Sequence, residues 1–174
     1  PNGAGKTTFF NVMTGVYPGS SGDILFRGEM IRGRRSHEIT TLGIARTFQN
    51  IRLFSNMTAL ENVMVGRHCR SSQRLLGPLL RLPSFHREEA AIETAAKELL
   101  AFVGILPLGN ELAKNLSYGN QRRLEIARAL ATEPKLLILD EPTAGMNSTE
   151  SQGLVDLVRK VQARGVTVLL IEHQ

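Results

Sequence analysis

The chain alternates between short apolar runs and longer segments in which apolar residues recur at helical spacing. Residues 136–139 and 166–171 form two nearly unbroken apolar runs. Runs of this length are typical of strands buried on both faces of a parallel sheet. A further short strand is expected in the sequence GDILFRG, residues 22–28.

Helices are expected around these strands. Residues 5–14 predict a helix that starts in a glycine-rich loop and ends at Gly15, where a left-handed backbone costs glycine little. Thr58 and Glu61 have the spacing of a capping box. The helix that follows carries an apolar stripe of Leu60, Val63 and Met64.

Three later segments also show helical spacing. The first closes at Gly104, the second opens at Ser117 and Gly119, and the third is capped by Asn147 or Ser148. Their inward faces are expected to be Ile92, Ala96, Leu99 and Val103; Leu124, Ala127, Leu130 and Ala131; and Leu154, Leu157, Val158 and Val161.

Strands that alternate with helices predict an α/β fold with a parallel sheet. The 174 residues, 42% apolar and 21% charged, suit one globular domain, 1–174, with an all-helical insertion at approximately 56–133. The basic, leucine-rich stretch within it is broken at Pro78 and Pro83. No apolar run approaches the roughly 18–20 residues that cross a bilayer, so a membrane role would come through partners.

The net charge of +5 raises the possibility of nucleic-acid binding. However, the arginines are scattered, and the densest group, in residues 66–88, alternates with leucines and contains no aromatic stacking pair. A solvated helix face or a surface against another subunit explains this group equally well. The single cysteine, Cys69, allows no internal disulfide and is given no role.

Two segments carry candidate phosphate chemistry. The opening GAGKTT is weak evidence alone, but a helix starting there would direct backbone N–H groups at phosphates, with Lys6 on the β and γ oxygens and Thr7 on Mg²⁺. The segment KLLILDEP places Asp140 and Glu141 at the carboxyl end of a buried strand, where parallel sheets bind ligands. Asp140 is suited to hold Mg²⁺ and Glu141 to polarise a water.

The segment NLSYGN supplies a second helix start that suits an anion, through the Ser117 hydroxyl and free amides. With these motifs in this order, the chain resembles the ATP-binding subunits of ATP-binding-cassette (ABC) transporters. The resemblance covers essentially the whole chain and implies a P-loop NTPase core, which looks truncated at both ends. The matching positions are Asn2, Gly3, Ala4, Gly5, Lys6, Thr7 and Thr8 (Walker A), Gln49 (Q-loop), Ser117, Tyr118, Gly119 and Asn120 (signature), Asp140 and Glu141 (Walker B), Asn147 (D-loop) and His173 (switch).

The resemblance implies an ATPase that works as a head-to-tail pair. Each ATP would lie between the Lys6 loop of one subunit and the signature of the other, with Asn147 at the dimer contact. Mg²⁺, bound with the substrate ATP, would be held by Thr7, Gln49 and Asp140. Glu141, His173 and Gln49 would be the catalytic residues.

Four positions depart from the usual family pattern. Tyr118 replaces a signature glycine, Asn120 stands where glutamine is usual, Asn147 replaces an aspartate, and Gln174 follows the histidine where aspartate is common. The chain resembles the subunits that power branched-chain amino acid uptake. This resemblance rests on Tyr118 and on the segments TFQNIRLFSNMTALENVMVG, PSFHR and QRRLEIARAL. The departures at positions 120 and 174 affect the expected turnover more than nucleotide binding.

The resemblance therefore implies an importer ATPase, peripheral at the cytoplasmic face of the plasma (inner) membrane. Its expected partners are a second ATPase subunit, identical or a sister chain, transmembrane permeases and, indirectly, a solute-binding receptor; no direct nucleic-acid contact is expected. The alternatives are a soluble ABC ATPase acting on ribosomes or nucleic acid, and a non-hydrolysing regulator, which the intact Lys6, Asp140 and Glu141 disfavour.

The missing leading glycine of the Walker motif, the absence of a preceding strand and the end just after His173 are typical of a fragment of a longer cassette. On that basis we expect the isolated 174 residues to bind ATP poorly and to leave sheet edges unpaired.

Overall fold

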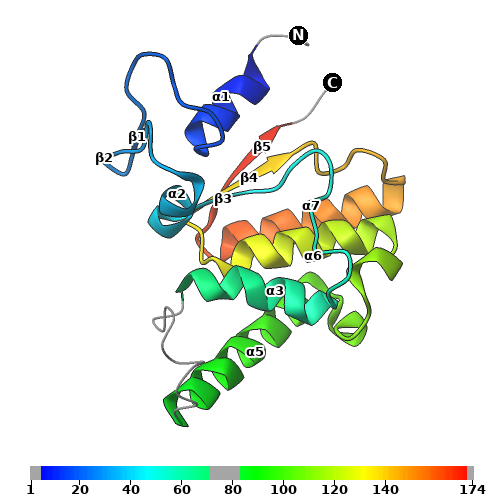
Figure 1. Cartoon of the computed structure of the whole chain (residues 1–174). Coiled ribbons are helices and arrows are strands. Elements are labelled where there is room, and N and C mark those ends of the chain that lie inside the picture. The colour runs from blue at the N-terminus through cyan, green and yellow to red at the C-terminus, as the bar shows by residue number, and fades with distance from the viewer. Residues whose placement is uncertain (1–4, 71–82, 172–174) are drawn as a thin grey trace.

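A three-stranded parallel sheet forms the centre of the molecule (Figure 1). The computed structural model describes residues 5–70 and 83–171. The strands, in spatial order, are β3 (Ile44–Arg46), β4 (Leu136–Asp140) and β5 (Thr167–Ile171). β4 is the central strand: it pairs with β3 along Leu136–Ile138 and with β5 along Leu136–Asp140.

One face of the sheet is covered by the first part of the chain. The elements there are α1 (Lys6–Met13), the antiparallel hairpin of β1 (Leu25–Phe26) and β2 (Glu29–Met30), and α2 (Ser36–Leu42). They surround a small core that includes Phe10 and Met13 of α1 and Ile138 of β4. This packing holds α1 against the sheet.

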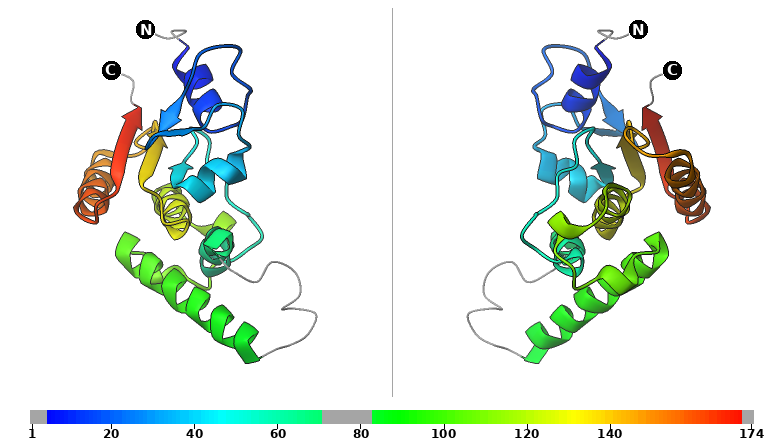
Figure 2. Two further views of the ribbon diagram at one scale, coloured as in Figure 1. Left: turned by 90° about the vertical axis from the view of Figure 1, so that its left-hand side faces the viewer. Right: turned by 90° about the vertical axis from the view of Figure 1, so that its right-hand side faces the viewer.

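The other face is covered by helices, with α6 and α7 side by side and α3 and α5 farther out (Figures 1 and 2). Their bounds are α3 (Ala59–Arg67), α5 (Pro83–Val103), α6 (Tyr118–Ala131) and α7 (Ser148–Ala163), with short 3-10 turns η1 (His68–Arg70), η2 (Leu106–Leu108) and η3 (Ala113–Asn115). A larger core fills this side and reaches β4 through Leu137 and Leu139. Among the described residues, no helix is long and apolar enough to cross a bilayer.

Most of the predicted elements are confirmed. The two apolar runs are β4 and β5, and the predicted helices are α1, α3, α5, α6 and α7. Two short elements, α2 and β3, were not predicted, and the expected strand in 22–28 is shorter and belongs to a hairpin. On α5, Leu100 is the fully buried leucine, while Leu99 is only partly buried.

The helical insertion at 56–133 stays a prediction as to its bounds. The described helices between β3 and β4 agree with its helical character, and α5 begins at Pro83. Pro78 lies outside the described residues.

The predicted capping box starts α3. The backbone N–H of Glu61 donates to the Thr58 hydroxyl at 3.1 Å, and Glu61 accepts from the backbone N–H of Thr58 at 2.7 Å. This backbone bond, and then the Thr58 hydroxyl, lowers the pKa of the Glu61 carboxyl. The start of α3 is therefore fixed by local contacts that can be predicted from the sequence.

Helices α3 and α6 approach each other closely at Gly66. A Cβ at this position would lie 2.4 Å from the backbone carbonyl oxygen of Arg128 and 3.2 Å from the Ala131 Cβ. No real side chain fits at such a distance from backbone, so glycine is what permits the two helices to pack in contact.

We expect Gly66→Ala to destabilise the protein by about 1–2 kcal/mol, since overpacking against backbone outweighs the helix propensity that alanine gains. Urea unfolding measures the change. Gly153→Ala is the matched control, because its new Cβ would meet only a movable guanidinium nitrogen of Arg123, 2.7 Å away on α6. A stability of Gly66→Ala equal to or above that of Gly153→Ala would contradict the tight crossing.

Candidate functional site

The candidate site lies where β4 and β5 end and α1 begins (Figures 1 and 2). Gly5 adopts a left-handed backbone with φ of 76° at the helix start, and Lys6 is the first residue of α1. Thr7 and Thr8 are exposed in the first turn. The first turn of α1 thus directs backbone N–H groups outward at this end of the sheet.

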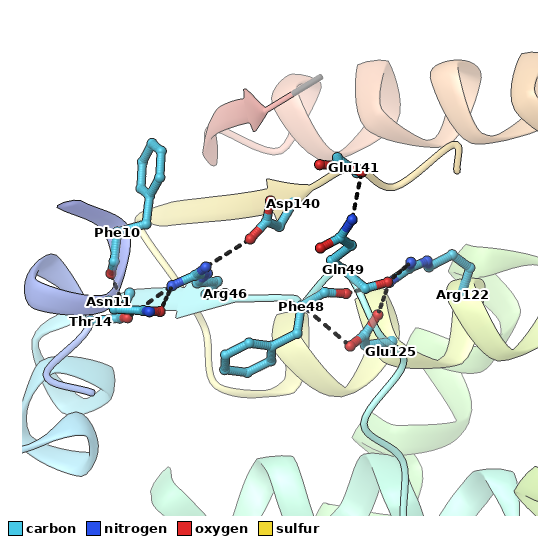
Figure 3. A network of polar contacts seen from close by, with 10 residues as sticks. All are labelled: Phe10, Asn11, Thr14, Arg46, Phe48, Gln49, Arg122, Glu125, Asp140 and Glu141. Atoms are coloured by element: carbon cyan, nitrogen blue, oxygen red, sulfur yellow. Dashed lines mark hydrogen bonds and ion pairs between the residues drawn. The ribbon is translucent and has the colours of Figure 1, made fainter. Parts of the chain in front are cut away.

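Asp140, the last residue of β4, is bound by Arg46 of β3. The Arg46 Nη2 lies 2.7 Å from Asp140 Oδ2, and the two side chains are 4% and 11% exposed. The other guanidinium nitrogen, Nη1, donates to Asn11 Oδ1 at 2.8 Å (Figure 3). Arg46 therefore joins α1, β3 and the end of β4, a connection that the sequence analysis missed.

The side chain of Arg46 is also held by aromatic rings. Its guanidinium lies 5.9 Å from the ring centroid of Phe10 and 5.2 Å from that of Phe48. These contacts, with the ion pair, keep a charged group within a largely apolar environment.

Glu141 follows β4 in an unusual backbone conformation. Its φ is 44°, a left-handed value that is uncommon outside glycine. Its N–H donates to the carbonyl of Ile171 at 2.8 Å, and its carboxylate accepts from Gln49 Nε2 at 2.9 Å (Figure 3). Strained residues fixed by their surroundings cluster at functional sites, which makes Glu141 a strong candidate.

The backbone around Gln49 is clamped by a buried ion pair on α6. Arg122 donates to the carbonyl oxygens of Phe48 at 2.6 Å and Gln49 at 2.5 Å, and to Glu125 at 2.8 Å. Glu125 accepts from the backbone N–H of Phe48 at 3.4 Å and of Arg52 at 3.5 Å. Arg122 and Glu125 are 0% and 2% exposed.

This ion pair, like that of Arg46, was not predicted from the sequence. The available signal was an arginine and a glutamate three residues apart, close to Leu124 on the predicted apolar face of the helix.

The signature residues occupy the start of α6, on the face of the sheet opposite α1. The Ser117 hydroxyl caps the helix by accepting from the backbone N–H of Asn120 at 3.4 Å. A Cβ on Gly119 would lie 2.8 Å from Glu150 Oε1, so the start of α6 is packed against the start of α7. Asn147 caps α7 through a bond from the Glu150 N–H at 2.8 Å.

The predicted site residues therefore fall into two groups. Lys6, Thr7, Gln49, Asp140 and Glu141 gather around the end of the sheet, whereas Ser117, Tyr118, Gly119, Asn120 and Asn147 lie where α6 and α7 begin. Asn2, Gly3, Ala4 and His173 lie outside the described residues.

The ligand atoms near the end of the sheet suit a magnesium ion. Thr7, Gln49 and Asp140 offer hydroxyl, amide and carboxylate oxygens, the hard donors that Mg²⁺ prefers. Residues 5–70 and 83–171 contain no cluster of three or more histidine, cysteine or acidic side chains arranged for a metal. A site with one or two carboxylates completed by substrate phosphates is the usual arrangement for Mg²⁺.

A hollow of about 680 Å³ lies beside the Q-loop, between β3, α3 and α6. Arg46, Phe48, Arg52, Val65 and Arg128 are among its lining residues. The Arg52 guanidinium lies 4.3 Å from the Phe48 ring centroid. Burial lowers the pKa of the Arg128 guanidinium, and nearby Glu125 opposes this shift; arginine stays charged even so.

The sequence profile of the ABC transporter family matches residues 1–144. The chain belongs to the ABC transporter family. The high-affinity branched-chain amino acid transport ATP-binding protein LivG of Escherichia coli K12 is 44% identical over 99% of the chain and 68% of its own length. BraF of Pseudomonas aeruginosa, described in the same words, is 47% identical over the same shares.

Solved ABC structures share the fold. The ADP conformation of an ATP-binding cassette has a TM-score of 0.81 and 35% identity over 100% of this chain and 68% of its own. A dimeric post-hydrolysis cassette bound to ADP and Pi has a TM-score of 0.79 and 26% identity over 100% and 72%. The expected ABC ATPase fold is confirmed, and these relatives give no support to the ribosome or nucleic-acid alternative.

We expect Arg46→Ala to lower the free energy of unfolding by about 3–5 kcal/mol, because it leaves the buried Asp140 carboxylate without its partner. Urea unfolding of the purified protein measures this. The control is Arg159→Ala, whose ion pair with Asp156 is exposed, and which should change stability by no more than about 0.5 kcal/mol. Similar losses in the two variants would show that the Arg46 pair has no special structural role.

Proposed function

We propose that this chain is the ATP-hydrolysing subunit of an ABC importer for branched-chain or related amino acids. The observation that carries the proposal is the contact between Gln49 and Glu141, next to Asp140 at the end of β4 and beside the start of α1. The similarity to LivG and BraF supports this choice of transported solute. The protein would act at the cytoplasmic face of the inner membrane, held there by its partners.

In this proposal, one group of residues binds a single ATP and another group hydrolyses it. The first turn of α1, with Gly5, Lys6, Thr7 and Thr8, binds the phosphates together with Asn2, Gly3 and Ala4. Glu141 accepts the proton of the attacking water, and Gln49 orients Glu141 through the 2.9 Å hydrogen bond. His173 contacts the γ-phosphate or the water.

The metal-binding residues would be Thr7, Gln49 and Asp140. A bound Mg²⁺ would supply positive charge to the β and γ phosphates. Arg46 pairs with Asp140 and fixes its direction, so the carboxylate is already placed before ATP binds.

The second group of residues is proposed to act on the ATP of a partner subunit. Because α1 and α6 lie on opposite faces of the sheet, their amino ends do not converge on one nucleotide within the chain. The Ser117 hydroxyl and the backbone of Tyr118, Gly119 and Asn120 would reach the partner's γ-phosphate, and Asn147 would contact the partner. The dimeric cassette with ADP and Pi supports such a pair.

In the full-length protein, we expect Glu141→Gln to lower ATP hydrolysis about 100-fold or more, the usual effect of removing a general base. ATP binding should persist, and an ATP-dependent dimer should accumulate because its bridging phosphate is no longer removed. Phosphate release and size-exclusion chromatography measure the two effects. Glu98→Gln, an exposed change on α5, is the control; hydrolysis by Glu141→Gln at the rate of that control would refute the assignment.

The hollow beside the Q-loop is the proposed contact with the permease. Phe48 and Arg52 line the hollow, so an occupant would press directly on the loop that carries Gln49. Val65 stands at this hollow on α3 and is 38% exposed, which leaves an apolar side chain available to a partner. A permease bound here would respond to movement of the Q-loop.

We expect Val65→Glu to abolish co-purification with the transmembrane subunits while the ATPase activity of the free subunit is unchanged, since burying an unpaired carboxylate is costly. Val155→Glu on α7 is the matched control, because Val155 is 39% exposed. If Val65→Glu retains the membrane subunits, or Val155→Glu loses them equally, the permease contacts another surface.

A further inference from the structure

Tyr118 stands at the signature position but its side chain is engaged within its own subunit. Its hydroxyl oxygen accepts a hydrogen bond from Arg122 Nη2 at 3.2 Å. The Arg122 guanidinium lies 5.8 Å from the ring centroid, on the border of a cation–π contact. The phenol thus touches the residue that clamps the Q-loop.

The same ring also lies beside Gly145, two residues before the D-loop residue Asn147. A Cβ placed on Gly145 would lie 3.5 Å from Tyr118 Cε1 and 3.7 Å from Cζ. Gly145 has a φ of 77°, so glycine is favoured there on conformational grounds as well. One aromatic side chain therefore lies next to Gly145 and also bonds to Arg122.

Arg122 Nη2 serves two acceptors. It donates to the carbonyl oxygen of Gln49 at 2.5 Å and to the Tyr118 hydroxyl at 3.2 Å. The orientation of the guanidinium is thus set partly by Tyr118. Since Gln49 in turn donates to Glu141, three hydrogen bonds connect the start of α6 to the carboxylate at the end of β4 (Figure 3 shows the part from Arg122 onward).

We propose that Tyr118 is a positioning residue for its own subunit. Through Arg122 it holds the Q-loop backbone in place, so that the Gln49 side chain stays within hydrogen-bonding distance of Glu141. The signature end of α6, which in the proposed function meets the partner's nucleotide, is thereby linked to the hydrolytic carboxylate of the same chain. The inference rests on the proposed function for its kinetic consequence. Its structural consequence, a stiffer Q-loop, requires no nucleotide.

The change that tests the inference is Tyr118→Phe, which removes only the hydroxyl. The chain contains one other tyrosine, the exposed Tyr17, so Tyr17→Phe is the matched control. In the nucleotide-free full-length protein, amide hydrogen exchange of residues 47–53 should become about 3- to 10-fold faster in Tyr118→Phe, the factor expected for one ordinary hydrogen bond. It should not change in Tyr17→Phe.

The kinetic measurement separates positioning from direct binding. Tyr118→Phe should lower kcat by about 3- to 10-fold and leave KM for ATP nearly unchanged, because Gln49 is less well placed while the phosphate-binding turn is intact. A raised KM with unchanged exchange at 47–53 would mean that the hydroxyl acts only on the partner's nucleotide, and would overturn the inference. Unchanged exchange and unchanged kinetics would overturn it too.

Failure of the proposed function is distinguishable from failure of this inference. If the unmodified protein hydrolyses no ATP, the proposed function fails, and the exchange measurement still decides whether Tyr118 stiffens the Q-loop. If the unmodified protein hydrolyses ATP, Glu141→Gln abolishes it and Tyr118→Phe resembles Tyr17→Phe in exchange, only the inference fails.

Discussion

The arrangement of the site depends on one buried ion pair, Arg122 with Glu125, whose side chains satisfy backbone groups of the Q-loop. A loop without regular hydrogen bonding ordinarily remains on the surface, because buried backbone groups need partners. The pair supplies four of them, to backbone groups of Phe48, Gln49 and Arg52, and so holds the loop against α6 while Gln49 and Asn50 stay exposed. Without this support, the backbone of Gln49 would not be held in place, and its side chain would not be positioned to donate to Glu141.

A second ion pair, Arg46 with Asp140, has a similar connecting role on the other face of the sheet. It ties α1 to β4 through Asn11 and so sets α1 relative to the carboxylates at the end of the sheet. Asp140 and Glu141 are adjacent in sequence but are bound from different sides, one by a strand and one by a loop. The two pairs together join both halves of the molecule at the end of a single central strand.

The sequence predicted the elements whose signals are local. The capping box at Thr58, the cap at Asn147 and the apolar runs of β4 and β5 needed no knowledge of the fold. It did not predict β3, because three residues ending in a charged arginine are too short for an alternating pattern.

Arg46, Arg122 and Glu125 were missed for a related reason. Charged residues are normally exposed, and only tertiary contacts with Asp140 and with the Q-loop backbone explain their burial. The motif positions were found because these motifs follow one another in a fixed order along the chain. The residues that support them have no such order, because their role depends on tertiary contacts.

The double pairing of β4 has a mechanical consequence. β4 is paired with β3 along Leu136–Ile138 and with β5 along Leu136–Asp140, so a shift of the strand would break both ladders, and the carboxylates after it keep a fixed position relative to the sheet. The Q-loop joins β4 through the backbone hydrogen bond from the Thr47 N–H to the Ile138 carbonyl and through the Gln49 side chain on Glu141, and it joins α6 through Arg122. Because single side-chain hydrogen bonds are weak, we expect any relative movement at the site to occur in the loop beyond Thr47 rather than in β4.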